Sequence, residues 1–248
     1  MDSAARRTAE SRLARRSAGF PVSRSWRDRA GCVVTGSFED NQVTPALRVL
    51  GREDCPQDPL RGWTLAVLGY GNQGRAQALN LRDSGHAVVV SARAAGSGAA
   101  RAGAEGFRVI APEDLPAEAD LVAVLLPDQV QEQVLDDLIA RSQRLGPACR
   151  IRALVFAHAF VLRFATPGFL ASWDVGVVAP AGPGVQLRER YLEGSGIPAL
   201  LGIHRDSSGE AEARLRAYGA AIGCASAGML ATTPSAEAEI DLFGEQAV

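Results

Sequence analysis

The chain has 248 residues, which is enough for one or two domains with a sizeable core. Its composition is that of an ordinary globular protein, and a formal net charge of −2 gives no overall attraction to nucleic acids or acidic membranes. No stretch approaches about 18 uninterrupted apolar residues, so no membrane-spanning helix is expected. All 26 basic residues are arginines, which excludes Schiff-base chemistry by lysine.

The first 58 residues lack a pattern typical of a folded domain. Residues 1–31 are rich in Arg, Ala and Ser, and residues 32–58 show no clear periodicity beyond a short strand predicted at 32–34. We expect 1–58 to be a poorly ordered extension and linker. Asp2 and Glu10 argue against an organellar transit peptide, because such peptides are poor in acidic residues, so we expect a cytoplasmic protein, with organellar targeting as the alternative.

From Trp63 onward, predicted strands alternate with predicted helices. The strands are expected at 64–68, 87–91, 107–110, 121–126, 151–157, 174–179 and 198–203, and the helices at 72–84, 98–105, 113–118, 129–144, 186–192 and 208–222. Nearly continuous apolar strands of this kind predict an α/β fold, a Rossmann-type doubly wound and mostly parallel sheet with helices on both faces, over residues 59–233. Ligands of such sheets bind at the carboxyl ends of the strands.

The segment 64–85 carries a dinucleotide-binding fingerprint. Gly69, Gly71 and Gly74 stand in G-x-G-x-x-G order between a predicted strand and a predicted helix. Gly69 allows a tight turn, Gly71 lets a pyrophosphate approach the backbone, and Gly74 lets the helix lie close to the strand. The alternative is a glycine-rich turn without a ligand.

The residues after the second strand bear on cofactor choice. An NAD-specific site would place Asp or Glu there to hold the ribose 2′-hydroxyl, but the chain has Arg93, with Ser97 shortly after it. A guanidinium and a hydroxyl suit a 2′-phosphate, so the segment favours NADP(H). The alternative for Arg93 is a solvated surface residue.

Three more strand ends carry candidate residues. Asp128 follows the fourth strand and is either a helix cap or a cofactor contact. His158 follows the fifth, where it either contacts substrate or water or is a core histidine. The Pro- and Gly-rich segment ending at Gly184 follows the sixth and is either a ligand loop or a structural turn.

An acidic stripe lies near the end of the chain. If this region is helical, Asp241 and Glu245 lie one turn apart on one face, and Glu237 extends the stripe. Two such carboxylates can bind Mg²⁺, although acidic pairs of this spacing are also common on solvated helix faces.

Taken in series, these motifs resemble ketol-acid reductoisomerase (acetohydroxy acid isomeroreductase). The resemblance rests on LGYGNQGRAQALNLRDSG, LLPDQVQ, FAHAF, VAPAGPG, YLEGSGIPALLGIH and DLFGEQAV, and covers Leu60–Val248. It implies an NADPH- and Mg²⁺-dependent oxidoreductase of valine, leucine and isoleucine biosynthesis. Such an enzyme shifts an alkyl group within 2-acetolactate or 2-aceto-2-hydroxybutanoate and then reduces the ketone by hydride transfer.

The resemblance also implies roles for individual residues. Cofactor contacts would come from the fingerprint and from later strand ends: Gly69, Tyr70, Gly71, Asn72, Gln73, Gly74, Arg93, Ser97, Asp128, Gln129, Val130, Gln131 and Gly184. His158 would be the active-site histidine, and Asp241 and Glu245 would bind two Mg²⁺ ions acting as Lewis acids on the substrate.

The chain departs from the family pattern at several points. The family's loop reads VAPKGPG, whereas the lysine position is Ala181 here, and the glycine after the histidine is Ala159. The family continues after DLFGEQ into an all-helical domain with two more metal carboxylates and a substrate-binding serine. Residues 234–248 are therefore expected to be the start of a truncated helical domain.

These departures lead to three functional hypotheses. The first is a reductoisomerase-type NADP-binding domain that is incomplete and weakly active or inactive alone, and that would need a helical domain supplied by another chain. The second is a non-catalytic NADP-binding fragment, or a partner of a full-length relative, with a homo-oligomer as one possible assembly. The third is a stand-alone NADPH-dependent reductase of a small carbonyl, with His158 as proton donor.

Overall fold

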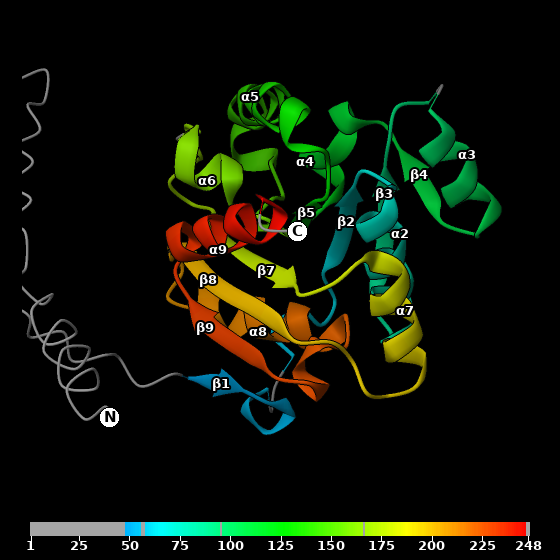
Figure 1. Cartoon of the computed structure of the whole chain (residues 1–248). Helices are drawn as coiled ribbons and strands as arrows, with labels where there is room; N and C mark the ends of the chain where they lie inside the picture. Colours follow the sequence, from blue (N-terminus) through cyan, green and yellow to red (C-terminus); the bar gives the residue numbers. More distant parts are fainter. Residues whose placement is uncertain (1–47, 56–57, 95, 166, 247–248) are drawn as a thin grey trace, which may run out of the picture. The chain divides into compact units, whose positions relative to one another are not determined.

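Nine strands of the described chain form one sheet in the order β1-β9-β8-β7-β6-β5-β2-β3-β4 (Figure 1). The computed structural model describes residues 48–55, 58–94, 96–165 and 167–246, with the backbone alone for 244–246. The expected extension 1–31 and the predicted strand 32–34 lie outside these residues. The described residues belong to one compact unit.

The strands are β1 (Val49–Leu50), β2 (Thr64–Leu68), β3 (Ala87–Ser91), β4 (Arg108–Ile110), β5 (Leu121–Val124), β6 (Ala153–Phe156), β7 (Asp174–Pro180), β8 (Ala199–Arg205) and β9 (Met229–Thr232). The helices are α2 (Asn72–Asp83), α3 (Ser97–Ala104), α4 (Leu115–Glu118), α5 (Asp128–Leu145), α6 (Phe160–Phe164), α7 (Gly184–Leu192), α8 (Ala211–Ala221) and α9 (Pro234–Gln246). Short 3-10 turns are η1 (Arg52–Asp54), η2 (Pro112–Asp114), η3 (Gly146–Ala148) and η4 (Cys224–Ser226).

Strand directions divide the sheet into two parts. From β4 to β7 all neighbours run parallel, β8 is antiparallel to β7, and β9 is parallel to β8. The carboxyl ends of β2, β3, β5, β6 and β7 therefore meet at one edge. The predicted mostly parallel, doubly wound sheet is confirmed. From residue 64 onward each predicted strand and helix is present, the strands 64–68 and 87–91 with the predicted ends and the others with shifted ends.

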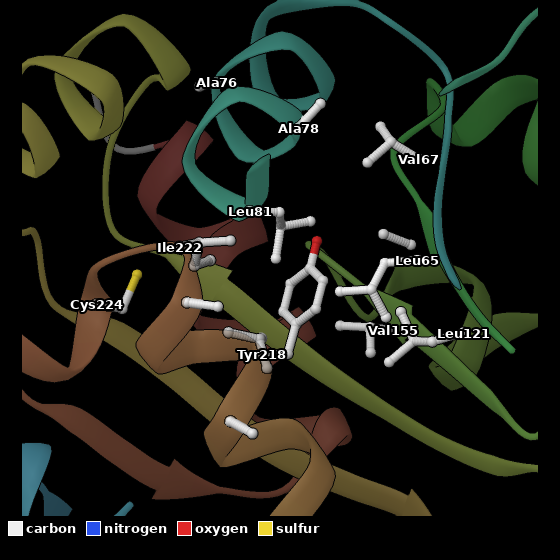
Figure 2. Packing of buried hydrophobic residues seen from close by; sticks show 14 of the residues in the cluster. Leu65, Val67, Ala76, Ala78, Leu81, Leu121, Val155, Tyr218, Ile222 and Cys224 are labelled. Atoms are coloured by element: carbon white, nitrogen blue, oxygen red, sulfur yellow. The ribbon is translucent and has the colours of Figure 1, made fainter. Parts of the chain in front are cut away.

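Alternation along the strands produces two cores, one on each face of the sheet. Along β2, Leu65 and Val67 point into one core, and Ala66 and Leu68 point into the other. The first core contains side chains of α2, α7 and α8, and the second contains side chains of α4, α5, α6 and α9. Figure 2 shows the first, where Tyr218 of α8 extends toward α2.

Two short strands and one short α-helix were not predicted. Strand β1 lies in the segment expected to be a linker and pairs antiparallel with β9, which was also missed. Helix α6 follows directly after His158. Each has two to five residues, so none offers a run long enough to display a periodicity.

No helix of the described chain has the length and apolar character needed to cross a membrane.

Candidate functional site

The glycine loop between β2 and α2 has the geometry that its spacing predicts. Gly69 has φ +98°, a value that favours glycine, and a Cβ there would lie 2.7 Å from the carbonyl oxygen of Leu125. A Cβ at Gly74 would lie 2.0 Å from the carbonyl oxygen of Gly69, so helix and loop touch at this point. A Cβ at Gly71 would meet nothing within 4 Å. The loop therefore leaves open space at the amino end of α2.

A cleft of about 820 Å³ opens at this loop. Its walls come from the glycine loop, the β3–α3 connection, η2 and the exposed face of α5. Seven of the predicted cofactor residues line it: Gly69, Tyr70, Gly71, Arg93, Ser97, Gln129 and Val130. These residues were predicted from three separate segments, and the fold brings them together.

Arg93 lies at the exposed β3 side of the cleft. No ion pair joins it to any other residue in the described part of the chain. Its guanidinium is therefore available to an anion. The nearby wall also contains Ser91, whose buried hydroxyl lacks a hydrogen-bond partner among the described residues. Sequence reasoning did not single out Ser91, because it is the last residue of a buried strand.

Tyr70 offers the cleft little more than its backbone. Its side chain is buried, packs edge-on against Phe107, and donates a hydrogen bond to Glu105. Burial, reinforced by that hydrogen bond, raises the pKa of the Tyr70 phenol well above its usual value. Tyr70 therefore lines the cleft as a packing residue whose hydroxyl is engaged by Glu105.

The remaining predicted cofactor residues lie outside the wall of this cleft. Asn72 and Gly184 line a second cavity of about 530 Å³, together with Gly71. A Cβ at Gly184 would lie 2.2 Å from the carbonyl oxygen of Asn72, so the starts of α7 and α2 touch there. Gly74 is the packing glycine described above. The side chain of Gln73 donates to the carbonyl of Gly182 at 2.8 Å.

Asp128 and Gln131 face the protein rather than the cleft. The interpretation of Asp128 as a helix cap is wrong, because Pro127 is the N-cap of α5 and has no side-chain hydrogen bond. Asp128 instead accepts a hydrogen bond from Gln131 at 2.9 Å. Gln131 is buried and also donates to the carbonyl of Leu126 at 2.8 Å, which holds the turn from β5 into α5.

His158 lies among three carboxylates from two helices. Its Nδ1 atom is 3.1 Å from Asp241 and 3.4 Å from Glu237 on α9, and its Nε2 atom is 3.7 Å from Asp128 on α5. Burial alone would lower the pKa of His158, but the hydrogen bond to Glu237 and the charges of Glu237, Asp241 and Asp128 outweigh it and raise the pKa. The three carboxylates therefore favour the protonated form of the imidazole.

The sheet register explains why α9 reaches His158. Thr232 of β9 pairs with Gly202, Gly202 with Val177, and Val177 with Phe156, the last residue of β6. Helix α9 therefore begins level with the end of β6, two residues before His158. In Figure 1, α9 lies across this part of the sheet beside α6.

Glu237 is the principal member of this site that sequence reasoning did not assign a role. Its carboxylate is 2% exposed and accepts a hydrogen bond from the backbone N–H of Ala159 at 2.7 Å. The only sequence signal was its place four residues before Asp241 on one helix face.

The described residues do not form a metal centre. No group of three or more His, Cys, Asp or Glu side chains within them has an arrangement that could hold a metal ion. Of the two predicted ligands, Asp241 lies beside His158, and the side chain of Glu245 lies outside the described residues.

Comparison with known proteins decides the family. A family model described as "Acetohydroxy acid isomeroreductase, NADPH-binding domain" matches residues 59–228. The chain belongs to the acetohydroxy acid isomeroreductase family. The predicted resemblance to ketol-acid reductoisomerase is confirmed over this domain, which is the family's NADPH-binding domain.

Relatives agree with this assignment. The chain is 46% identical over 185 residues to "Ketol-acid reductoisomerase (NADP(+))" of Xanthomonas campestris pv. campestris, covering 75% of this chain and 54% of that protein. The protein of the same description from Xanthomonas oryzae pv. oryzae is 45% identical over 184 residues, covering 74% and 54%. The chain thus spans about half the length of the curated relatives it matches.

Solved structures agree as well. An NADH-preferring ketol-acid reductoisomerase from an uncultured archaeon superposes with a TM-score of 0.75 at 37% identity, covering 81% of this chain and 61% of that one. An oxidoreductase from Jannaschia sp. superposes with a TM-score of 0.58 at 17% identity, covering 75% of this chain and 68% of that one. At this low identity the similarity supports the fold alone.

Proposed function

We propose that this chain binds NADP(H) in the cleft of the glycine loop as the cofactor-binding part of a ketol-acid reductoisomerase. The observation that carries the proposal is the open approach at Gly71 beside the amino end of α2, with Arg93 free of ion pairs to the described residues at the other end of the cleft. Unpaired N–H groups at a helix start favour a pyrophosphate, and a guanidinium favours a 2′-phosphate.

Preference for NADPH over NADH is part of this proposal. The curated relatives carry NADP(+) in their names, whereas the archaeal structure is described as NADH-preferring. In this chain the β3–α3 connection contains Arg93, Ser97 begins α3, and no acidic residue stands between them to receive a ribose 2′-hydroxyl. We therefore expect isothermal titration to give a lower Kd for NADPH than for NADH. An equal or lower Kd for NADH would contradict the proposed preference.

For chemistry, we propose His158 as the group that holds or delivers a proton at the substrate. Its three neighbouring carboxylates favour the charged imidazolium. Asp241 and Glu245 remain the proposed magnesium ligands, and the ion when bound supplies Lewis-acid polarisation of substrate oxygens. If they bind Mg²⁺, titration with Mg²⁺ should give heat with the wild type that is lost in Asp241→Asn.

The proposed substrates are 2-acetolactate and 2-aceto-2-hydroxybutanoate, and we propose that turnover by this chain alone is weak. Ala181 stands where the reductoisomerase family pattern has a lysine, and the chain contains no lysine that could take its place. Loss of one member of a cooperating site usually costs several powers of ten in rate. Robust NADPH oxidation by the chain alone with 2-acetolactate and Mg²⁺ would contradict the proposed weak turnover.

A second candidate function is reduction of a small 2-oxo acid without the alkyl shift. The carboxylates around His158 favour it, because they raise the pKa of the imidazole and reduction of a ketone needs one proton donor besides the hydride. The test compares 2-acetolactate with 3-hydroxy-3-methyl-2-oxobutanoate, which needs only reduction. Turnover of the second substrate alone favours this candidate. NADPH binding with turnover of neither favours a non-catalytic cofactor-binding protein or a partner of a full-length relative.

A further inference from the structure

A chain of hydrogen bonds links the core beneath α2 to the loop that follows β7. The Tyr218 hydroxyl donates to Oε1 of Gln77 at 2.6 Å, Nε2 of Gln77 donates to Oε1 of Gln73 at 3.1 Å, and Nε2 of Gln73 donates to the carbonyl of Gly182 at 2.8 Å. We call these four residues the amide chain. Figure 2 shows Tyr218 extending toward α2 among Leu81 and Leu65.

The hydrogen bonds of the amide chain can run in only one direction, from Tyr218 to Gly182. The carbonyl of Gly182 can only accept, so Gln73 must present its nitrogen there and its oxygen to Gln77. Gln77 must then present its oxygen to Tyr218, whose hydroxyl has to be the donor. Tyr218 and Gln77 are both 0% exposed, so water does not replace either partner. The carbonyl of Gly182 therefore dictates the orientation of both amides, and the buried hydroxyl of Tyr218 completes the chain as its last donor.

The amide chain ends at the loop after β7, on the side of the sheet toward which a bound dinucleotide would extend. Gly182 stands between the end of β7 and Gly184, which touches the start of α2 at Asn72. Strands β5, β6 and β7 lie on one side of β2, whereas β3, which leads to Arg93, lies on the other. A dinucleotide with its 2′-phosphate at Arg93 and its pyrophosphate at α2 must extend toward the β7 side.

Helix α7 has its own attachment to α2. Arg188 donates to Asn80 at 2.8 Å and pairs with Asp83. Loss of the amide chain would therefore leave α7 docked and would remove the contact of Gln73 with the carbonyl of Gly182. The loop at 181–183 would keep its backbone hydrogen bond from Ala181 to the carbonyl of Pro198 at 2.8 Å, so we expect a shift of the loop rather than its detachment. The amide chain acts on the loop and not on the whole helix.

We propose that Gln77 and Tyr218 are positioning residues that set the loop after β7 for the nicotinamide half of the cofactor, acting through Gln73. This inference rests on the proposed function, since it presumes a bound dinucleotide. It also changes the role of Gln73, whose side chain holds the loop while its backbone remains at the helix start.

The test measures two ligands on the full chain by isothermal titration: NADPH, and 2′,5′-ADP, which carries only the adenosine half with its phosphates. In Gln77→Leu and Tyr218→Phe we expect NADPH to bind about fivefold more weakly, the usual effect of one lost hydrogen bond, while the affinity for 2′,5′-ADP is unchanged. The fluorescence of bound NADPH, which reports the surroundings of the nicotinamide ring, should fall in both variants.

Tyr218→Phe removes a single oxygen atom, so the test can still be made with this variant if Gln77→Leu fails to fold. Leu79→Ala serves as the matched control, because it thins the packing of the same helix and leaves the amide chain intact. Equal weakening of both ligands, an unchanged NADPH affinity, or the same selective loss in Leu79→Ala would overturn the inference. Failure of the wild type to bind NADPH would overturn the proposed function and this inference with it.

Discussion

The carboxylate of Glu237 accepts a hydrogen bond from the backbone N–H of Ala159 at 2.7 Å, so α9 is fastened directly to the residue after His158. In Glu237→Ala this N–H is left buried without a partner, which should lower the free energy of unfolding by about 1–3 kcal/mol. Urea denaturation measures the change. Glu239→Ala is the matched control on the same helix, because its 65% exposed side chain forms a surface ion pair with Arg163, which contributes little to stability. A Glu237→Ala protein as stable as this control would contradict the expectation.

His158 should make stability depend on pH. Its pKa is raised in the folded state, so its contribution is complete below the unfolded value near 6.5 and is lost as pH rises through the folded pKa. Urea denaturation across that range, with EDTA present so that no metal competes for Asp241, should show the stability advantage of the wild type over His158→Gln shrinking with rising pH. Comparing the two proteins cancels the opposite contribution of His204, whose pKa is lowered by burial and by Arg205. A stability advantage of the wild type over His158→Gln that grew with rising pH would contradict the raised pKa of His158.

Arg93 should discriminate between the two nicotinamide cofactors. Its replacement by Ala removes a charge-assisted contact to the 2′-phosphate and should weaken NADPH binding about 10- to 100-fold while leaving NADH binding nearly unchanged. Titration with each cofactor measures the effect. Arg144→Ala, an exposed arginine of α5 outside the cleft wall, should change neither Kd. Parallel loss of both cofactors in Arg93→Ala would mean that Arg93 does not contact the 2′-phosphate.

Two glycines of the loop should respond differently to the same substitution. In Gly74→Ala the new Cβ would press on the carbonyl oxygen of Gly69, so we expect a loss of about 1–3 kcal/mol in stability. In Gly71→Ala the Cβ enters open space, so stability should stay within about 0.5 kcal/mol.

NADPH affinity separates the two roles further. Gly71→Ala should bind NADPH about tenfold more weakly or worse, because its Cβ would stand where the pyrophosphate approaches. Thermal denaturation and NADPH titration of both variants supply the comparison. Wild-type NADPH affinity in Gly71→Ala would contradict binding of the pyrophosphate beside Gly71.

Sequence reasoning predicted most of the fold because nearly continuous apolar strand segments alternate with helical segments from residue 63 onward. The three glycines and the rule that ligands lie at strand ends predicted the position of the cleft, and the same rule placed His158 at the correct edge. It did not predict which way a helical side chain turns. Gln73 and Gln131 both follow strand ends, yet the amides bind protein carbonyls at Gly182 and Leu126.

The contact of Glu237 with Ala159 escaped prediction for a different reason. It depends on β9, a strand of four residues whose register brings α9 level with the end of β6. Nothing local to either residue encodes that register, which arises from pairing across β8 and β7.

The separation of these contacts along the chain has a consequence for synthesis. The residues that line the cofactor cleft all fall between Leu68 and Arg141, whereas the Glu237–Ala159 hydrogen bond joins positions 78 residues apart. A chain emerging from the ribosome can complete the cleft long before Glu237 exists to close the surroundings of His158. During translation the residues of the cleft therefore precede those that complete the surroundings of His158, the proposed proton donor, in a fixed order.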